Sequence, residues 1–355
     1  MGLIKRFQKQ KSYLGLDISS GYLKLLELDL SEEVPRLVNI AVVPLKSEAF
    51  NNNIIVNPEI LSEQIANLLE ANEIQDKEIV ACVPATSVFT KRIKVPDLDD
   101  NELRSHINFE AANFIPHNVS NVKLDYHVSG RSGKNNLDCL VVAVKNEVVD
   151  SLVGVIESSG LKVGIVDVDF LAVQNMFETN YPDLVSSNVA LINIGSKFSS
   201  LNICKNGESL LNGDVSVGSK SIVEAIGQAT GLSGDDVEKG KSSISENHKA
   251  KEALDGAIEN LASEYNRQLN FLWSNAQSDE GIDAIVICGN CMGISDLSKE
   301  LSEKTGIPCH IANPLKNIAI GEGFDEEYVK SLSNHMSACV GLAIRHAGDR
   351  NNFAE

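Results

Sequence analysis

Apolar residues recur along this chain with two periods, one typical of strands and one typical of helices. An apolar strand that turns through Gly and Ser and then runs back opens each half, over 13–28 and 188–203. After the first hairpin, the pattern predicts a strand over 36–45, a helix over 57–72 and a strand over 78–83. The opening of the chain therefore predicts an α/β unit in which a helix packs on an open sheet.

A smaller unit is expected to interrupt this first domain. Its predicted elements are a strand over 87–95, a helix over 100–114, strands over 122–128 and 137–145, and a helix over 146–159. We expect these elements to form an inserted β-α-β-β-α subdomain over 86–160. Residues 12–85, 161–187 and 326–346 then make up the first domain around it.

A second domain is expected over 188–325, with a helical subdomain at 219–281. Beyond its opening hairpin, the predicted elements are strands over 208–217, 284–288 and 308–312, and helices over 220–230, 234–239, 248–273 and 294–304. A helix over 334–346 is expected to close the chain.

Both hairpin turns are suited to hold an anion. The first apolar strand ends at Asp17 and continues Ile-Ser-Ser-Gly21, and the second ends at Asn193 and continues Ile-Gly-Ser196. Backbone N–H groups in such small-residue turns form a cradle that phosphate oxygens approach closely. Because one such hairpin opens each half, we expect a nucleotide held between two related domains.

The net charge of −18 argues against partners that it would repel, namely nucleic acid and anionic lipid surfaces. The exception is a basic cluster near the start, Lys5, Arg6, Lys9 and Lys11, which is either a solvated tail or a weak contact with a membrane or partner. The sequence contains no apolar run of about 18 residues, so we expect no membrane span and a cytoplasmic location.

The seven cysteines are scattered, as in proteins of reducing compartments. Cys288 and Cys291 have the spacing of a redox motif or half of a zinc site, but no second pair with matching spacing accompanies them in the sequence. Cys288 also ends an apolar strand, where a buried, inert thiol is usual. We therefore favour packing over redox or metal chemistry for this pair.

Five patterns follow one another in an order that resembles the actin, hexokinase and sugar-kinase superfamily. They are a first phosphate hairpin (15–24), a first connecting helix (167–172), a second phosphate hairpin (193–200), an adenosine loop (289–293) and a last connecting helix (338–343). The resemblance implies an actin-like two-domain fold around a single nucleotide.

Within the superfamily, the chain is most similar to the PilM family of type IV pilus assembly, and more distantly to the FtsA family. The stretches that carry this likeness are 15–20, 93–100, 109–116, 122–126, 160–167, 307–308 and 313–314. The position of the inserted unit favours the same branch. The resemblance implies an ATP-binding scaffold in the inner-membrane alignment complex of the pilus, linked to the pilus motor. It also implies that the cytoplasmic N-terminal tail of PilN docks in a groove that involves residues 86–160.

The resemblance further implies particular site residues. Asp17, with Asn193, is expected to hold a hydrated Mg²⁺ ion, although Asp17 alone is also typical of a turn. The residues expected at the phosphates are Ser19, Ser20, Gly21, Lys24, Gly195, Ser196 and Lys197. Those expected at the adenosine are Gly218, Lys220, Glu238, Lys241, Gly289 and Asn290. Lys24 is equally explained as a solvated strand residue, and the charged members of the adenosine set as surface salt bridges.

Two departures from the superfamily pattern change the expected chemistry. Asn193 stands where an acid is common, and an amide neither takes a proton from water nor binds Mg²⁺ as an anion does. Cys291 and Met292 stand in the adenosine loop where glycines are common. We therefore expect ATP to be bound with slow or no turnover, and we do not expect an enzyme.

Two alternatives on the same fold stay open. A small-molecule kinase would need a polar substrate cleft with a general base, whereas the inserted unit offers Phe109, Phe114, Ile115 and Leu124, which suit an extended peptide or the unit's own core. A filament-forming membrane anchor would need a terminal amphipathic helix, and residues 345–355 are polar. We therefore expect recruitment to the inner membrane by a partner, and leave self-association open.

Overall fold

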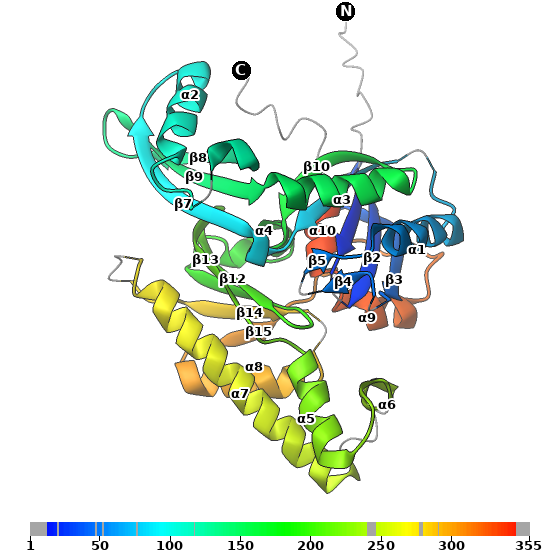
Figure 1. Cartoon of the computed structure of the whole chain (residues 1–355). Helices are drawn as coiled ribbons and strands as arrows, with labels where there is room; N and C mark the ends of the chain where they lie inside the picture. Colours follow the sequence, from blue (N-terminus) through cyan, green and yellow to red (C-terminus); the bar gives the residue numbers. More distant parts are fainter. Residues whose placement is uncertain are drawn as a thin grey trace, which may run out of the picture.

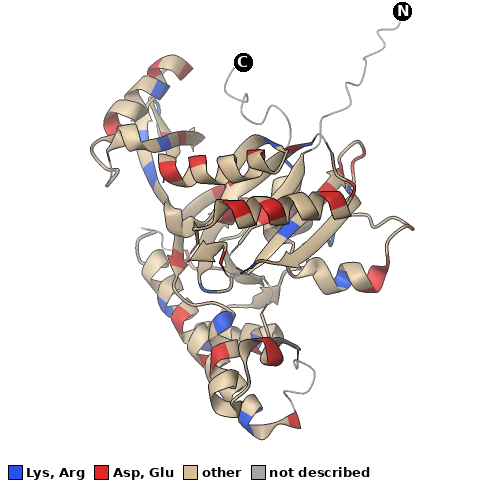
Figure 2. Cartoon of the chain, turned by 45° about the vertical axis from the view of Figure 1, so that its right-hand side comes forward, with Lys and Arg blue, Asp and Glu red and all other residues tan. Residues whose placement is uncertain are grey.

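The computed structural model describes residues 13–345, except residues 20, 47, 52, 76, 117, 240–245, 277–279 and 290. The basic cluster from Lys5 to Lys11 and the polar segment 346–355 lie outside the described residues. In the part of the chain that is described, no helix combines the length and the apolar character needed to cross a membrane. Figure 2 shows Asp and Glu positions (red) along the outer helices, in keeping with the acidic composition.

The first half of the chain forms a five-stranded sheet in the order β10-β6-β1-β2-β3 (Figure 1). Its strands are β1 (Leu14–Ile18), β2 (Tyr22–Asp29), β3 (Arg36–Pro44), β6 (Glu78–Val83) and β10 (Lys162–Val168). β1, β2 and β3 form an antiparallel meander, and β6 and β10 run parallel to β1. A short hairpin of β4 (Phe50–Asn51) and β5 (Ile54–Ile55) lies outside this sheet.

The second half forms a sheet with the same plan, in the order β15-β14-β11-β12-β13. Its strands are β11 (Val189–Ile194), β12 (Ser199–Lys205), β13 (Glu208–Val215), β14 (Ala284–Cys288) and β15 (Cys309–Ile311). Again three strands form an antiparallel meander, and two more run parallel to the first of them. The duplicated hairpin of the sequence is thus the start of a duplicated sheet.

A third, smaller sheet has the order β7-β9-β8 and is antiparallel throughout. It consists of β7 (Val88–Pro96), β8 (Val122–Arg131) and β9 (Asn136–Lys145), flanked by the turns η1 (Ala85–Ser87) and η2 (Val119–Asn121). Helix α2 (Asp100–Ala111) packs on one face through Leu103 and Ile107. α2 ends three residues before the expected end at 114.

Helix α3 (Asn146–Ser158), which the sequence associated with the small unit, also packs on the first sheet. Its buried residues Leu152, Val155 and Ile156 belong to the hydrophobic cluster formed by β1, β6 and α1 (Pro58–Ala71). The domain boundaries stay a prediction, but α3 joins its neighbour α1 as a cover of the first sheet (Figure 1).

The small sheet is also joined to the second sheet. Thr90 Oγ1 donates a hydrogen bond to Asn212 Oδ1 at 2.8 Å, and Arg92 Nη1 donates to the carbonyl oxygen of Ser209 at 2.7 Å. Arg92 further pairs with Glu208 at 3.3 Å. These contacts connect β7 to β13 across the boundary between the two halves.

Two helices lie between the large sheets: α4 (Asp169–Asn180), followed by the turn η3 (Pro182–Leu184), and α10 (Ser337–Ala343). Every residue of α10 is buried. A side chain at Gly341 would overlap the carbonyl oxygen of Ala172 in α4, and one at Gly15 would come within 2.5 Å of the carbonyl oxygen of Cys339. Glycine at both positions therefore lets α10 fit between β1 and α4.

The bounds of the helix expected over 334–346 are wrong. The structure has α9 (Glu326–Ser333), a turn and then α10, which ends at Ala343. The sequence analysis did not predict α9, a helix of eight residues in which only Val329 is buried.

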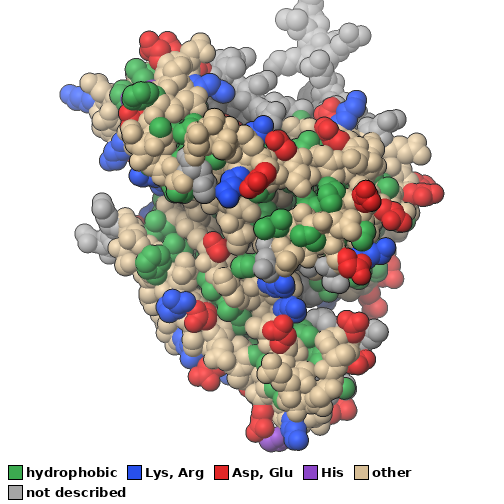
Figure 3. All heavy atoms as spheres, viewed as in Figure 1, with side chains coloured by type: hydrophobic (Ala, Val, Ile, Leu, Met, Phe, Trp, Pro, Cys, Tyr) green, Lys and Arg blue, Asp and Glu red, His purple; other side chains and the backbone are tan. Residues whose placement is uncertain are grey.

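The outer face of the second sheet is covered by helices. They are α5 (Lys220–Thr230), α6 (Gly234–Lys239), α7 (His248–Trp273) and α8 (Ile294–Thr305), in the lower part of Figure 1. The buried Tyr265 of α7 shares a 2.8 Å hydrogen bond with Ser199 Oγ. On the face shown in Figure 3, hydrophobic side chains are interspersed with charged ones.

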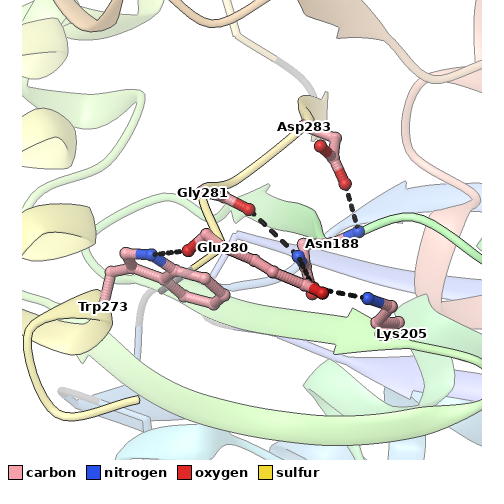
Figure 4. A network of polar contacts seen from close by, with 6 residues as sticks. All are labelled: Asn188, Lys205, Trp273, Glu280, Gly281 and Asp283. Atoms are coloured by element: carbon pink, nitrogen blue, oxygen red, sulfur yellow. Dashed lines mark hydrogen bonds and ion pairs between the residues drawn. The ribbon is translucent and has the colours of Figure 1, made fainter. Parts of the chain in front are cut away.

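A polar network fixes the start of the second sheet to the segment after α7 (Figure 4). The Asn188 side chain donates to Glu280 Oε2 at 3.1 Å and to the Gly281 carbonyl at 3.0 Å. Lys205 Nζ also donates to Glu280 Oε2 at 2.7 Å, and the hydrogen bond from Lys205 is the main cause of the lowered pKa of Glu280. Trp273 Nε1 donates to the Glu280 carbonyl at 3.0 Å. The network anchors the entry into β11.

Candidate functional site

A cavity of about 330 Å³ lies between the two large sheets, and the turns of both hairpins line it. A Cβ built on Gly21 in the first turn would lie 3.6 Å from the Cβ of Ser196 in the second. The two turns therefore face each other. The predicted site residues that line the cavity are Asp17, Ser19, Gly21, Lys24, Asn193, Gly195, Ser196, Lys220 and Gly289.

Hydrogen bonds close each turn. In the first, the N–H and the hydroxyl of Ser19 both donate to the Tyr22 carbonyl at 3.1 Å. In the second, the Gly195 N–H donates to the Phe198 carbonyl at 3.1 Å. Ser200, which lies opposite Asn193 in the hairpin, is 5% exposed and lines the cavity. Its hydroxyl has no hydrogen-bond partner among the described residues, so the cavity wall offers a polar group to a ligand.

Lys24 lies inside the cavity and forms an ion pair with Asp17, Nζ to Oδ2 at 2.7 Å. The two residues face each other in the β1–β2 register, so the hairpin itself brings them together. Burial alone would lower the pKa of Lys24, but the Asp17 carboxylate more than compensates and the pKa is raised. The ammonium therefore stays charged inside the cavity.

Two acids that the sequence analysis missed also line the cavity. Asp169 begins α4 and accepts a hydrogen bond from the Ala85 N–H at 3.0 Å, and Asp214 lies near the end of β13. Burial raises the pKa of Asp169 to about 7, and the charges of Asp17 and Asp214 add to this shift. The only sequence signal was the position of Asp169 directly after an apolar strand.

Replacing Asp169 by asparagine is expected to make stability less dependent on pH. The folded state holds the Asp169 proton more tightly than the unfolded state, so the stability due to this proton is present below pH 4 and is lost as pH rises to about 7. At pH 8 the variant should be more stable than the wild type by about 2 kcal/mol, less than the full shift implies because the carboxyl is only half-buried. Urea denaturation from pH 4 to pH 8 measures the difference.

The matched control for that series is Asp183→Asn, which changes an exposed acid in η3. We expect its stability difference from the wild type to stay nearly constant over the same pH range. A similar pH trend in both variants would contradict the raised pKa of Asp169.

The remaining predicted residues have varied positions. Lys197 is half-buried and is not among the residues that line the cavity, and Lys220 pairs with Glu224 at 3.4 Å on the rim. Gly218 packs against the second turn, where a Cβ would lie 2.5 Å from the Ser196 carbonyl oxygen. Gly289 has a φ of +102°, which favours glycine. Ser20, Lys241 and Asn290 lie outside the described residues, as does the side chain of Glu238.

The packing role predicted for Cys288 and Cys291 is confirmed. Both thiols are buried, and each belongs to a hydrophobic cluster. Burial raises the pKa of Cys288 to about 12. The thiol therefore stays protonated and inert at neutral pH.

A second and larger hollow of about 1100 Å³ lies beside the small sheet, and we call it the groove. Its lining comes from β8, β9, β10, α4, the β12–β13 turn and the segment after α10. Leu140, Val142 and Leu171 make part of it apolar, whereas Glu178 and Arg345 bring charges. Arg345 forms an ion pair with Asp167 of β10. Residues of the small unit thus meet both halves of the molecule here.

Comparisons with known proteins agree with this architecture. The family model described as "Type IV pilus assembly protein PilM" matches residues 15–347. The solved structure of a PilM–PilN type IV pilus biogenesis complex is 21% identical, with a TM-score of 0.83, and the match covers 95% of this chain and 98% of that one.

Two further solved structures are similar over most of their length. The ethanolamine utilization protein EutJ from Carboxydothermus hydrogenoformans is 10% identical, with a TM-score of 0.56, covering 94% of this chain and 89% of that one. MreB5 of Spiroplasma citri, solved with AMPPNP bound, is 12% identical, with a TM-score of 0.50, and the match covers 90% of this chain and 97% of that one. The chain therefore has the actin-like ATPase fold.

Proposed function

Because the chain belongs to the PilM family of type IV pilus assembly proteins, we propose that it acts in pilus assembly as an ATP-binding scaffold that holds the cytoplasmic N-terminal tail of PilN. One observation carries the nucleotide part of the proposal. The turns of two equivalent hairpins, one from each large sheet, face each other across a single cavity. The solved complex with PilN supports the partner.

The cavity suits a nucleotide with its phosphates between the turns. Backbone N–H groups at Gly21 and Ser196 and the ammonium of Lys24 would face the phosphate oxygens. The unpartnered hydroxyl of Ser200 supplies a further hydrogen bond. The likeness to MreB5, which was solved with AMPPNP, supports the same arrangement. The base would lie toward Lys220 and Gly289, which line the cavity next to the second turn.

Magnesium fits this cavity only together with phosphate and water. Among the described residues, no group of three or more His, Cys, Asp or Glu side chains is placed to hold a metal ion. Mg²⁺ ordinarily keeps several waters and needs one or two protein oxygens besides the phosphates. Asp17 and Asn193 would supply them, in keeping with the ligands proposed from the sequence.

Gly21→Val is expected to weaken Mg-ATP binding at least tenfold. A Cβ at position 21 would already contact the Ser196 Cβ at 3.6 Å, so the two methyl groups of valine would fill the space between the turns, and the backbone at Gly21 does not require glycine. Titration calorimetry measures the affinity. Gly323→Val is the control, because that glycine is exposed and a Cβ there meets nothing within 4 Å. Equal affinities of the two variants would contradict a nucleotide between the turns.

We further propose that hydrolysis is slow or absent. The argument is Asn193, whose amide cannot take a proton from an attacking water. A phosphate-release assay should give a rate far below the enzyme median of about 10 per second. A rate near that value would contradict slow hydrolysis but would leave the proposed ATP binding unaffected.

The groove is the proposed site for the PilN tail. It is large, part apolar, and bordered by the small sheet, as the resemblance implied for the partner site. A synthetic peptide of the PilN tail should bind the full-length chain in fluorescence anisotropy, and a scrambled peptide should not. Running the titration with and without Mg-ATP tests whether the cavity influences the groove. Equal binding of both peptides would contradict the proposal.

The location follows from the same partner. We propose that the protein is cytoplasmic and is held at the inner membrane through PilN, and that the complex contacts the pilus motor ATPases. We also propose that copies of the chain contact one another. Co-purification of the motor ATPase with the chain, in the presence and absence of PilN, tests this step.

A further inference from the structure

Asn193, Ser200 and Asp214 form a row across three neighbouring strands of the second sheet. Asn193 of β11 lies directly opposite Ser200 of β12, and Ser200 lies directly opposite Asp214 of β13. Residues that lie directly opposite each other in an antiparallel ladder have their side chains on the same face. All three line the cavity between the large sheets. The row therefore places an amide, a hydroxyl and a carboxylate side by side on one wall of the cavity.

Two members of the row have oxygen atoms available to a ligand. The Ser200 hydroxyl is buried and has no hydrogen-bond partner among the described residues. Partial burial is the one cause of the raised pKa of Asp214, so within the described part of the chain neither a donor nor a cation stabilises its carboxylate. In contrast, Asn193 Oδ1 accepts a hydrogen bond from the Cys288 thiol of β14 at 3.7 Å. A group that bridges Ser200 and Asp214 would satisfy both of them.

The charges around this row favour a cation. The carboxylates of Asp214 and Asp17 both repel that of Asp169, since their charges contribute to its raised pKa. The buried ammonium of Lys24 lies in the same cavity but is already paired with Asp17. The phosphates of a nucleotide would add further negative charge to these carboxylates. A divalent cation that enters with the nucleotide would relieve the repulsion.

From this row we infer that Asp214 is a positioning residue for the Mg²⁺ ion that would enter with ATP. Its carboxylate and the Ser200 hydroxyl hold waters of the ion, and Asp214 supplies the negative charge that Asn193 does not. The inference rests on the proposed function and adds a residue to its metal site. Two strand spacings, about 10 Å, separate the backbones of Asn193 and Asp214. Because Mg²⁺ binds its ligands at about 2.1 Å and ordinarily keeps several waters, Asp214 acts through water and not as a direct ligand.

The test measures the ATP affinity of the full-length chain by titration calorimetry, once with Mg²⁺ and once with EDTA. With Mg²⁺, Asp214→Asn should weaken binding at least tenfold, as the loss of a charged hydrogen-bond acceptor usually does. With EDTA, the same variant should bind ATP at least as tightly as the wild type, because it lacks a carboxylate that repels phosphate. Weaker binding in both conditions, or tighter binding in both, would overturn the inference. If the wild type does not bind Mg-ATP, the proposed function fails instead.

Three further variants examine the row itself in the same two titrations. Ser200→Ala keeps every charge and should weaken binding with Mg²⁺ but not with EDTA. Asn193→Asp, added to the Asp214→Asn variant, returns a carboxylate to the row and should restore most of the lost affinity for Mg-ATP. Asp183→Asn is the control, because it removes an exposed acid of η3 and should change neither affinity. A double variant that binds Mg-ATP no better than Asp214→Asn would contradict the role of the row.

Discussion

Gly341→Ala is expected to lower the free energy of unfolding by about 3 kcal/mol or more, at the upper end of what overpacking costs. Helix propensity alone would favour alanine by about 1 kcal/mol. Here the added Cβ would overlap the carbonyl oxygen of Ala172 in α4, and a backbone atom cannot move aside as a side chain can. Urea denaturation followed by circular dichroism measures the effect.

The same substitution in an open helix should have the opposite sign. Gly256 lies on the exposed side of α7, and a Cβ there meets no atom within 4 Å. Gly256→Ala should therefore raise the free energy of unfolding by about 0.5–1 kcal/mol. If both variants were stabilised, the close approach of α10 to α4 would be wrong.

Lys24→Met is expected to cost about 3–5 kcal/mol of stability, as breaking a buried ion pair usually does. The side chains of Lys24 and Asp17 are only 14% and 9% exposed, so the variant would leave a carboxylate nearly without water and without its cation. Chemical denaturation at pH 7 measures the loss. The variant should also weaken Mg-ATP binding, because it removes the ammonium from the cavity.

The double variant Lys24→Met/Asp17→Asn separates burial from charge. It removes both charges together, so most of the lost stability should return, whereas the nucleotide affinity should not. A double variant as unstable as the single one would contradict the assignment of the lost stability to the ion pair between Lys24 and Asp17.

The repeated hairpin was predictable because it is local. The apolar runs, the turn residues and the register that sets Asp17 against Lys24 all lie within fifteen residues of sequence or fewer, where strand alternation determines which side chains meet. The likeness of the two hairpins also indicated that they share a cavity. The sheets, and most helix bounds in the second half, followed from the same periodicity.

The rest of the site depends on contacts between distant segments. Asp169 and Asp214 come from a helix start and a strand end that only the packed molecule brings to one cavity, and nothing in either segment marks it as part of a site. The residues that line the groove could not be predicted for the same reason, because its walls come from β8, β10 and α4. The packing of α3 on α1 also depends on how the intervening chain places the two helices in space, and the apolar period of a segment does not determine this.

The glycine contact between Gly15 and Cys339 has a consequence for biosynthesis. The strand that contacts α10 leaves the ribosome among the first residues, whereas α10 itself follows only after all three sheets have been translated. Until then, the apolar surface that α10 covers on β1 and α4 stays open to water or to a chaperone. A chain truncated before residue 337 should consequently be cleaved by proteases faster than a chain that includes α10.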